Sequence, residues 1–174
     1  MTQLPAPWMV RSLSVRDVPS LLQLQTICYG DMFLESEEVF ARRLASEYQC
    51  SLGVVQPGDT ALHAYLVGYW SNFGKVTPLN GEFNAPAPGA QVLYLHDMSV
   101  HPHLSGQGVA KHLLERLLQM GRERGVAQAC LVSVQGSQTY WERQGFSLCP
   151  VHDTQQQRNL ETYGQGAVYM ARAL

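Results

Sequence analysis

The chain has 174 residues, of which 45% are hydrophobic, and this fits a single domain over residues 1–174 with a substantial core. Its formal net charge of −2 gives no basic field for nucleic acid, and no apolar run forms a signal peptide or approaches the roughly 20 residues that span a bilayer. We therefore expect a cytoplasmic protein that binds neither nucleic acid nor membrane and keeps its four cysteines, none at C-x-x-C spacing, as free thiols.

The first part of the sequence predicts a short strand, two helices and two further strands. A β-type run opens "MVRSLSVRD", and the helix that follows has Pro19 in its first turn. Ser36 can cap a second helix in "SEEVFARRLASEY", where two glutamates favour the positive end of the helix dipole. The segments "SLGVVQ" and "HAYLVGYW" are typical of consecutive strands joined by the turn "PGDT".

The remaining elements alternate between strands and helices after a long loop. Residues 71–91 are rich in Gly, Pro and Asn, and this loop is too long for a plain connector, which indicates a functional or mobile segment. The strand "VLYLHDMSV" precedes a helix over residues 108–122, and "ACLVSV" is the next strand. A short helix in "SQTYWERQ" ends before Gly145, and "GAVYMARAL" closes the chain as a strand. The pattern predicts an α/β or α+β fold.

The helix after the strand "VLYLHDMSV" begins with Gly-Gln-Gly. The first backbone N–H groups of a helix have no partner within it, and the helix dipole adds partial positive charge there. Glycine removes the Cβ that would hold a ligand away, so residues 106–110 predict an anion site suited to phosphate. The loop is not a Walker A motif, because Lys111 sits inside the helix, and it is not G-x-G-x-x-G. The glycines alone also fit a tight strand–helix turn.

Two segments, "VHPHLSGQGVAKHLL" and "SQTYWERQGF", resemble the acetyl-CoA loop and the second signature of the GNAT superfamily of N-acetyltransferases. In the loop pattern Ser105 stands at the Gln/Arg position, Gly108 at the glycine and Ala110 at the Gly/Ala. The order of predicted elements agrees over nearly the whole chain. The resemblance implies an α/β (α+β) fold, in which one GNAT-like domain has a mixed, mostly antiparallel twisted sheet of six or seven strands, about four flanking helices and splayed central strands.

The resemblance also implies direct transfer of an acetyl group from acetyl-CoA to an amine acceptor, without a metal. The backbones of Met98 and Val100 would pair with the pantetheine arm, as an extended ligand pairs with a strand. Lys111 fits either a phosphate contact or a solvated helix face. The implied cofactor-binding residues are Met98, Ser99, Val100, Ser105, Gly106, Gln107, Gly108, Val109, Ala110 and Lys111.

His96 is our candidate for removing a proton from the amine, because histidine titrates near neutrality. The strand "LYLHDMSVH" resembles that of arylalkylamine acetyltransferases at Tyr94 and His96. In a regular strand the side chains of Met98 and Val100 share the face of His96, whereas a bulge would swap the faces locally. Asp97 is a catalytic candidate that would orient His96 or receive the substrate, and a core histidine is the alternative interpretation of His96.

Two departures from the family pattern affect the chemistry. The tyrosine that usually protonates the leaving thiolate is replaced by Trp141, and Tyr140 stands one residue earlier, about 100° around a helix. Tyr140 is therefore our candidate acid. Ser105 lacks the side chain of Gln or Arg, so the diphosphate would depend more on backbone amides.

In this family the acceptor groove lies between the first two helices and the loop before the central strand. Tyr29, Asp31 and Glu35 are the candidate substrate-binding residues, because acidic and aromatic groups suit a cationic amine with an apolar body. The acceptor is a small molecule or a peptide, and the protein is a monomer or homodimer. Two alternatives stay open. Trp141 and Ser105 favour a GNAT-like module that binds acyl-CoA without turnover, and the same helix start fits a nucleotide or dinucleotide binder.

Overall fold

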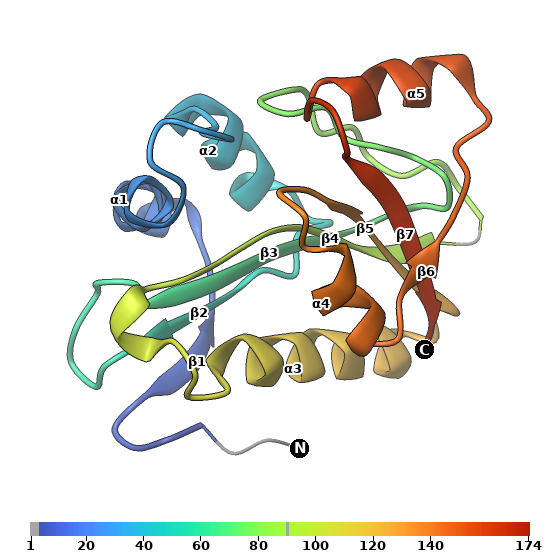
Figure 1. The fold of residues 1–174 in the computed structure, drawn as a ribbon. Helices are drawn as coiled ribbons and strands as arrows, with labels where there is room; N and C mark the ends of the chain where they lie inside the picture. The colour runs from blue at the N-terminus through green and yellow to red at the C-terminus, as the bar shows by residue number, and fades with distance from the viewer. Residues whose placement is uncertain (1–3, 90) are drawn as a thin grey trace.

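A computed structural model describes residues 4–89 and 91–174 and has a seven-stranded sheet at its centre (Figure 1). The strands lie in the order β1-β2-β3-β4-β5-β7-β6, and every neighbouring pair is antiparallel except β4 and β5. The strands are β1 (Met9–Ser12), β2 (Leu52–Val55), β3 (Ala64–Asn72), β4 (Gln91–Val100), β5 (Gln128–Ser133), β6 (Ser147–Leu148) and β7 (Val168–Ala173). The predicted fold class, a mixed and mostly antiparallel sheet of six or seven strands, is confirmed.

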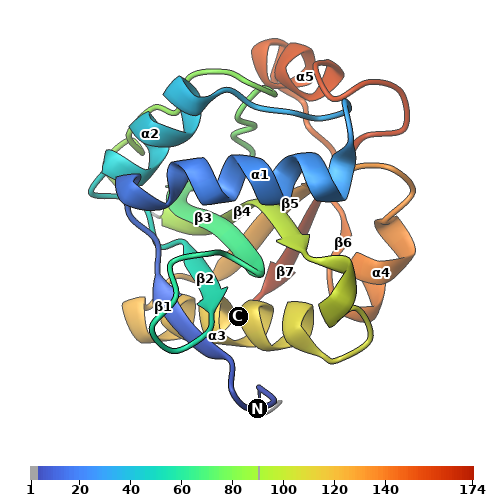
Figure 2. The same cartoon turned by 90° about the vertical axis from the view of Figure 1, so that its left-hand side faces the viewer.

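The described residues form five α-helices, which cover both faces of the sheet (Figures 1 and 2). Helices α1, α2 and α5 lie over one face, and α3 and α4 pack on the other. The helices are α1 (Val18–Tyr29), α2 (Glu37–Ala45), α3 (Val109–Arg124), α4 (Gln138–Arg143) and α5 (Thr154–Glu161). Ser36 caps α2 as predicted, since its hydroxyl accepts a hydrogen bond from the Val39 amide. No helix in this part of the chain is long and apolar enough to cross a membrane.

Helix α5 is the element that the sequence analysis missed, and it holds the long loop after β3. The described residues of that loop form no helix or strand. The Val76 amide donates to the side chain of Gln156 at 2.7 Å, and the Asn159 side chain donates back to the Val76 carbonyl at 2.8 Å. The Leu79 amide donates to the hydroxyl of Thr162 at 2.9 Å. These contacts fix the loop beside the sheet.

Strand β4 carries a β-bulge at its middle. The register with β3 shifts by one residue there, so His96 has no partner on β3. The side chains of Met98 and Val100 pack against the core on the α3 side, whereas His96 contacts Glu35 before α2. Met98 and Val100 therefore do not share the face of His96, and the structure has the alternative in which a bulge swaps the faces locally.

Strands β4 and β5 separate beyond the bulge, which gives the splayed arrangement that was expected. Their parallel pairing ends at Leu95. The His101 amide donates to the His63 carbonyl, so the alternation of an antiparallel pair directs the backbone groups of Met98 and Val100 away from β3. The N–H groups therefore face the gap between β4 and β5, while the two carbonyls accept hydrogen bonds from the side chains of Tyr29 and Cys28 on α1.

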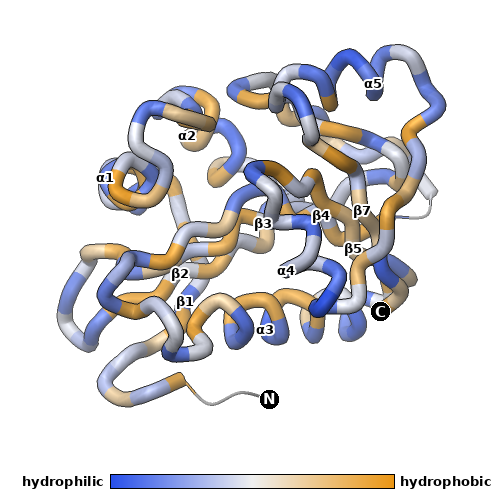
Figure 3. Tube along the Cα trace, in the orientation of Figure 1, coloured by the Kyte–Doolittle hydropathy of each residue, from blue (hydrophilic) through white to orange (hydrophobic). Residues whose placement is uncertain are grey.

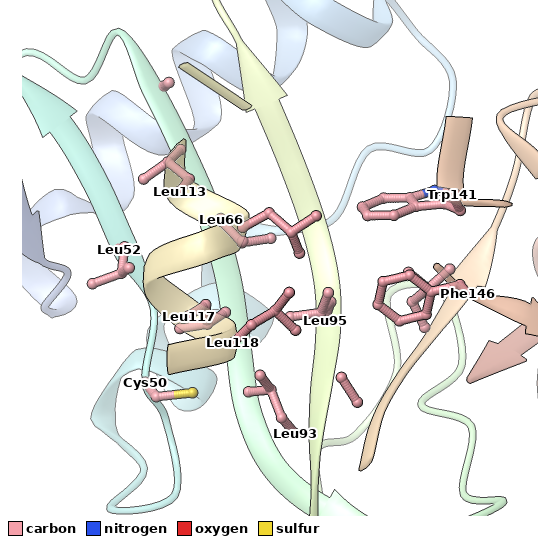
Figure 4. Close-up of a cluster of buried hydrophobic side chains, with 14 of the residues drawn as sticks. Cys50, Leu52, Leu66, Leu93, Leu95, Leu113, Leu117, Leu118, Trp141 and Phe146 are labelled. Carbon is pink, nitrogen blue, oxygen red and sulfur yellow. The ribbon is translucent and has the colours of Figure 1, made fainter. Parts of the chain in front are cut away.

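Apolar packing holds the sheet between its helix layers. Figure 3 shows hydrophobic residues along the central strands, while α5 is mostly hydrophilic. Leu113 and Leu117 of α3 pack under the sheet, and Trp141 and Phe146 lie beyond β4 from them (Figure 4). A second cluster joins α1 and α2 to β3, and a third lies near α5. The gap between β4 and β5 thus opens between firmly packed walls.

Candidate active site

A cavity of about 180 Å³ lies where β4 and β5 separate. Tyr29 and Asp97 line it on the α1 side of the sheet, and Leu66 and Trp141 line it on the α3 side. Most of its lining residues are aliphatic or aromatic, with a small number of titratable groups. Such a cavity suits an apolar ligand body with a few oriented polar groups.

His96 lines the cavity, but its imidazole is held by protein partners. Its side chain is only 2% exposed. Nε2 lies 2.8 Å from Glu35 Oε2, and Nδ1 lies 3.2 Å from the hydroxyl oxygen of Tyr69. Both ring nitrogens are engaged, so the imidazole takes a proton from a ligand only by losing one of these partners. This geometry makes His96 a positioning residue, and its direct role as a base stays a prediction.

Glu35 is the centre of the network around His96. Arg43 donates two hydrogen bonds to its carboxylate, one of 2.7 Å, and the Asn80 amide donates another at 2.8 Å. Burial acts to raise the pKa of Glu35, but His96 and Arg43 outweigh it and hold that pKa well below its usual range. The side chain is 2% exposed. Glu35 lines the cavity, and its carboxylate is buried and already paired, so that it ties the segment before α2 to β4; its role in binding the acceptor stays a prediction.

Asp97 lacks the cation that accompanies Glu35. Its Oδ1 accepts a hydrogen bond from the Tyr29 hydroxyl at 2.8 Å, and its Oδ2 accepts one from the Tyr65 hydroxyl at 2.6 Å. Burial raises the pKa of the Asp97 carboxyl, and the tyrosine hydrogen bonds oppose that effect only in part. No hydrogen bond joins Asp97 to the His96 ring in the described part of the chain, so the expectation that Asp97 orients His96 is not what the structure shows.

Tyr140 lines the cavity from α4. Its hydroxyl is buried and has no hydrogen-bond partner among the described residues, and burial raises its pKa. Trp141 packs edge-on against Phe146 in the core, although it also reaches the cavity wall. The offset of one residue therefore does not keep Tyr140 away from the cavity.

The loop before α3 presents backbone amides to open space. Gly106 and Gly108 have φ angles of 74° and 76°, which side chains other than glycine rarely adopt. A Cβ on Gly106 would meet nothing within 4 Å. Within the described residues no backbone hydrogen bond engages the amides of Gly106 or of residues 108–111, whereas the Gln107 amide donates to the Leu104 carbonyl at 3.3 Å. Free amides at a helix start form an anion site. The Gln107 amide is not part of it, because it already has a hydrogen-bond partner.

The other predicted cofactor residues differ in their placement. Ser105 is exposed in the loop, and Lys111 is exposed with its Nζ 3.9 Å from Glu115, one turn along α3. Ser99 is turned away from the gap, since it is 2% exposed and its hydroxyl donates to the Tyr65 hydroxyl at 3.0 Å. The structure therefore does not bring Ser99 to the gap.

Of the other predicted acceptor-binding residues, Tyr29 lines the cavity and Asp31 does not. Tyr29 reaches the cavity, and its hydroxyl donates to the Met98 carbonyl at 3.0 Å, which fastens the end of α1 to β4. Asp31 is exposed and is not among the described residues that line the cavity. Phe33 lines it instead, with a φ of 56° that is unusual for a residue other than glycine. Such a conformation often marks a functional segment.

Three residues of the site were not singled out from the sequence: Arg43, Tyr65 and Tyr69. Arg43 had one sequence signal, because it falls on the same helix face as Val39 and Phe40, which are buried. A charged residue on an apolar face needs a buried partner. The two tyrosines looked like ordinary core residues of β3, and only their hydroxyl contacts with β4 distinguish them.

Comparisons with known proteins place this fold among described families. A model of the acetyltransferase (GNAT) family matches residues 19–146. The ribosomal-protein-S18-alanine N-acetyltransferase from Escherichia coli is similar in structure, with 20% identity, a TM-score of 0.67, and coverage of 95% of this chain and 93% of that chain. Arabidopsis thaliana Naa50 in complex with the bisubstrate analogue CoA-Ac-MVNAL has 13% identity, a TM-score of 0.65, and coverage of 96% and 99%.

A third similar structure is the GphF GNAT-like decarboxylase in complex with isobutyryl-CoA. It has 16% identity and a TM-score of 0.70, with coverage of 95% of this chain and 98% of that chain. A search of curated protein sequences finds no match. At these identities the structural likeness establishes the fold.

Proposed function

The chain belongs to the acetyltransferase (GNAT) family, and on this premise we propose that it transfers an acetyl group from acetyl-CoA directly to a primary amine of a small molecule or peptide. The family match spans the loop before α3 and the whole of α4. Membership supports acyl transfer from an acyl-CoA in general. The acetyl donor and the amine acceptor are the specific parts of the proposal.

One observation carries the proposal: β4, the start of the helix that follows it, and the cavity each offer groups that suit one part of an acyl-CoA. Free amides stand at the start of α3, the backbone N–H groups of Met98 and Val100 face the space between β4 and β5, and Tyr140 lines the cavity. An acyl-CoA contains a diphosphate, two amides and a thioester. Each of these parts therefore has a complementary group in the protein.

Each group has a role that follows from its chemistry. The amides of Gly106 and residues 108–110 would neutralise the diphosphate, and the strand backbone would pair with the pantetheine amides. The amine attacks the thioester carbonyl carbon, the C–S bond breaks, and Tyr140 gives a proton to the departing thiolate. Backbone N–H groups of Met98 and Val100 would donate to the carbonyl oxygen as negative charge develops on it.

The similar structures support the acceptor class by what their names state. One is an N-acetyltransferase for an alanine of a ribosomal protein, and another is held with a CoA-linked peptide. The decarboxylase with isobutyryl-CoA has the same fold, so acyl groups larger than acetyl belong in the test. Trp141 at the usual tyrosine position favours a second candidate, an acyl-CoA-binding module without turnover.

The experiment measures thiol release from acetyl-CoA and isobutyryl-CoA in the presence of phenethylamine, spermidine and a peptide with an N-terminal alanine. The proposal expects amine-dependent release and an acetylated product by mass spectrometry. A binding module would instead show CoA binding alone, which a thermal shift detects, because a ligand at 100 times its Kd stabilises a protein by about 2.7 kcal/mol. If neither acyl-CoA stabilises the protein nor releases thiol, both candidates are wrong.

A further inference from the structure

Two buried carboxylates stand on neighbouring segments of the site, and only one has a positive partner. Arg43 pairs with Glu35, whereas no lysine or arginine forms an ion pair with Asp97 anywhere in the described residues. Asp97 keeps two hydrogen bonds, both from tyrosine hydroxyls. A carboxylate oxygen accepts more than one hydrogen bond, so both oxygens of Asp97 retain capacity for a donor from the cavity that it lines.

The surroundings of Asp97 make its charge costly without a ligand. Removing a carboxylate from water disfavours the charged form, and burial raises the pKa of Asp97 accordingly. The Glu35 carboxylate also raises the pKa of Asp97, whereas the tyrosine hydrogen bonds and His96 lower it. The titratable groups that face Asp97 from the surrounding elements are Tyr65, Glu35, His96, Tyr29, Cys28 and Tyr163. None of these is a lysine or arginine.

His96 is the other candidate base at this site, and it is less suited than Asp97 to take a proton from a ligand. Its two ring nitrogens already contact Glu35 and Tyr69, and its side chain is 2% exposed. Asp97 follows it directly in the chain and lines the same cavity, and its carboxylate oxygens can accept further hydrogen bonds. The bulge at His96 turns both side chains toward the α1 and α2 side of the sheet, where both residues line the cavity and the imidazole of His96 is held between Glu35 and Tyr69.

We propose that Asp97 binds the acceptor as its ammonium ion and then takes the proton that frees the amine for attack. This inference rests on the acyl-transfer function proposed above and deepens it. The acceptor class that follows is a cationic primary amine with an apolar body. Phe33, Leu79 and Tyr163 line the cavity on the acceptor side and provide apolar contact for that body.

The proton and bond changes balance within this assignment. An ionised Asp97 takes one proton from the ammonium group, and the neutral nitrogen attacks the thioester carbonyl carbon. The C–S bond breaks with its electron pair on sulfur, and Tyr140 protonates the thiolate. The second proton lost by nitrogen restores Tyr140, and the proton on Asp97 passes to solvent. The net products are the amide, CoA thiol and one proton.

The first test measures binding and needs no turnover. Calorimetry compares phenethylamine with phenethyl alcohol, its uncharged analogue, on the CoA complexes of the wild type and of Asp97→Asn. The proposal expects the charged ligand to bind the wild type at least about tenfold more tightly than the alcohol, a preference that Asp97→Asn removes. The control is Asp59→Asn, at an exposed turn between β2 and β3, which should keep the preference. Equal binding of both ligands to the wild type, or binding of neither, overturns the assignment.

The second test follows acetylation of the same amine across pH. Asp97→Asn should lower kcat/KM at pH 7 by about 10²-fold or more, the usual scale for a general base. The variant accepts only the neutral amine, so its kcat/KM should rise by about tenfold per pH unit up to the pKa of the amine. Asp97→Glu keeps the acid and should lie between the wild type and Asp97→Asn. Wild-type kcat/KM and pH profile in Asp97→Asn would refute the role of Asp97, whereas binding without acetylation in the wild type would instead refute the proposed function.

Discussion

Replacing Arg43 with methionine should destabilise the protein strongly, because it would leave Glu35 as a buried carboxylate without its main partner. The two side chains are 0% and 2% exposed, and Arg43 donates two hydrogen bonds to Glu35. Removing one partner of a buried pair costs about 3–5 kcal/mol. We expect the lower part of this range, since His96 remains beside Glu35 and the Asn80 amide still donates to it.

The neighbouring residue Arg42 provides a matched control on the same helix. Its side chain is 50% exposed and pairs with Glu38 and Glu82 at the surface. Surface pairs contribute roughly 0–1 kcal/mol, so Arg42→Met should change stability little. Urea unfolding at pH 7 measures both variants. At 2–4 °C per kcal/mol, a loss of about 3 kcal/mol in Arg43→Met should also lower Tm by roughly 6–12 °C. Equal losses in the two variants would refute the reasoning.

The pH dependence of stability gives a further check on the same pair. The pKa of Glu35 is lowered in the folded protein, so its contribution is fully present above the unfolded pKa of about 4.3 and is lost as pH falls toward the folded value. Without Arg43 the pKa of Glu35 is lowered less, because burial still favours the protonated form. The stability difference between wild type and Arg43→Met should therefore narrow as pH falls below about 4.3. A constant difference would mean that the loss comes from packing.

Three predictions concern the site itself. Gly108→Asp should lower CoA affinity at least about tenfold by calorimetry, because it adds a negative charge and strains a φ of 76°. The control Gly164→Asp, at an exposed glycine with a φ of 84°, should leave CoA affinity unchanged. Unchanged CoA affinity in Gly108→Asp would show that this loop does not bind the phosphates. His96→Gln should lower kcat/KM by about tenfold, or 1.4 kcal/mol, without altering the acidic limb of the pH profile, and a lost limb would show that the imidazole takes the proton. Tyr140→Phe should also cost about tenfold with CoA binding intact, and a loss beyond about 10³-fold would make Tyr140 the essential acid.

The sequence predicted those features of the site that depend on local pattern. The loop before α3 carries its own signal, because glycine at Gly106 and Gly108 has a conformational meaning that does not depend on distant residues. The helix caps and the alternating strands are local in the same sense. Helix α5 was missed although it has such a signal, since Asp153 caps it by accepting from the Gln156 amide.

The roles of the acidic residues could not be predicted, because they depend on partners far along the chain. Glu35 and Asp97 look alike as carboxylates near aromatic residues. The difference lies in Arg43, which buries its charge against Glu35, and in Tyr65, whose hydroxyl reaches Asp97 from β3. Their positions follow from the register of the sheet and the packing of α2, which no short segment encodes. Only the placement of Arg43 on an apolar helix face hinted at a buried ion pair.

The bulge in β4 connects this fold to the proposed chemistry. In a regular strand one of two consecutive residues points to each face, so either His96 or Asp97 would enter the leucine-rich core above α3. A carboxylate there would be desolvated and without a partner, which would cost several kcal/mol of stability. The extra residue instead turns both toward α1 and α2, where the charge of Glu35 is balanced by Arg43. Asp97 then presents the unbalanced negative charge at the cavity, and a cationic amine is the ligand that would neutralise it.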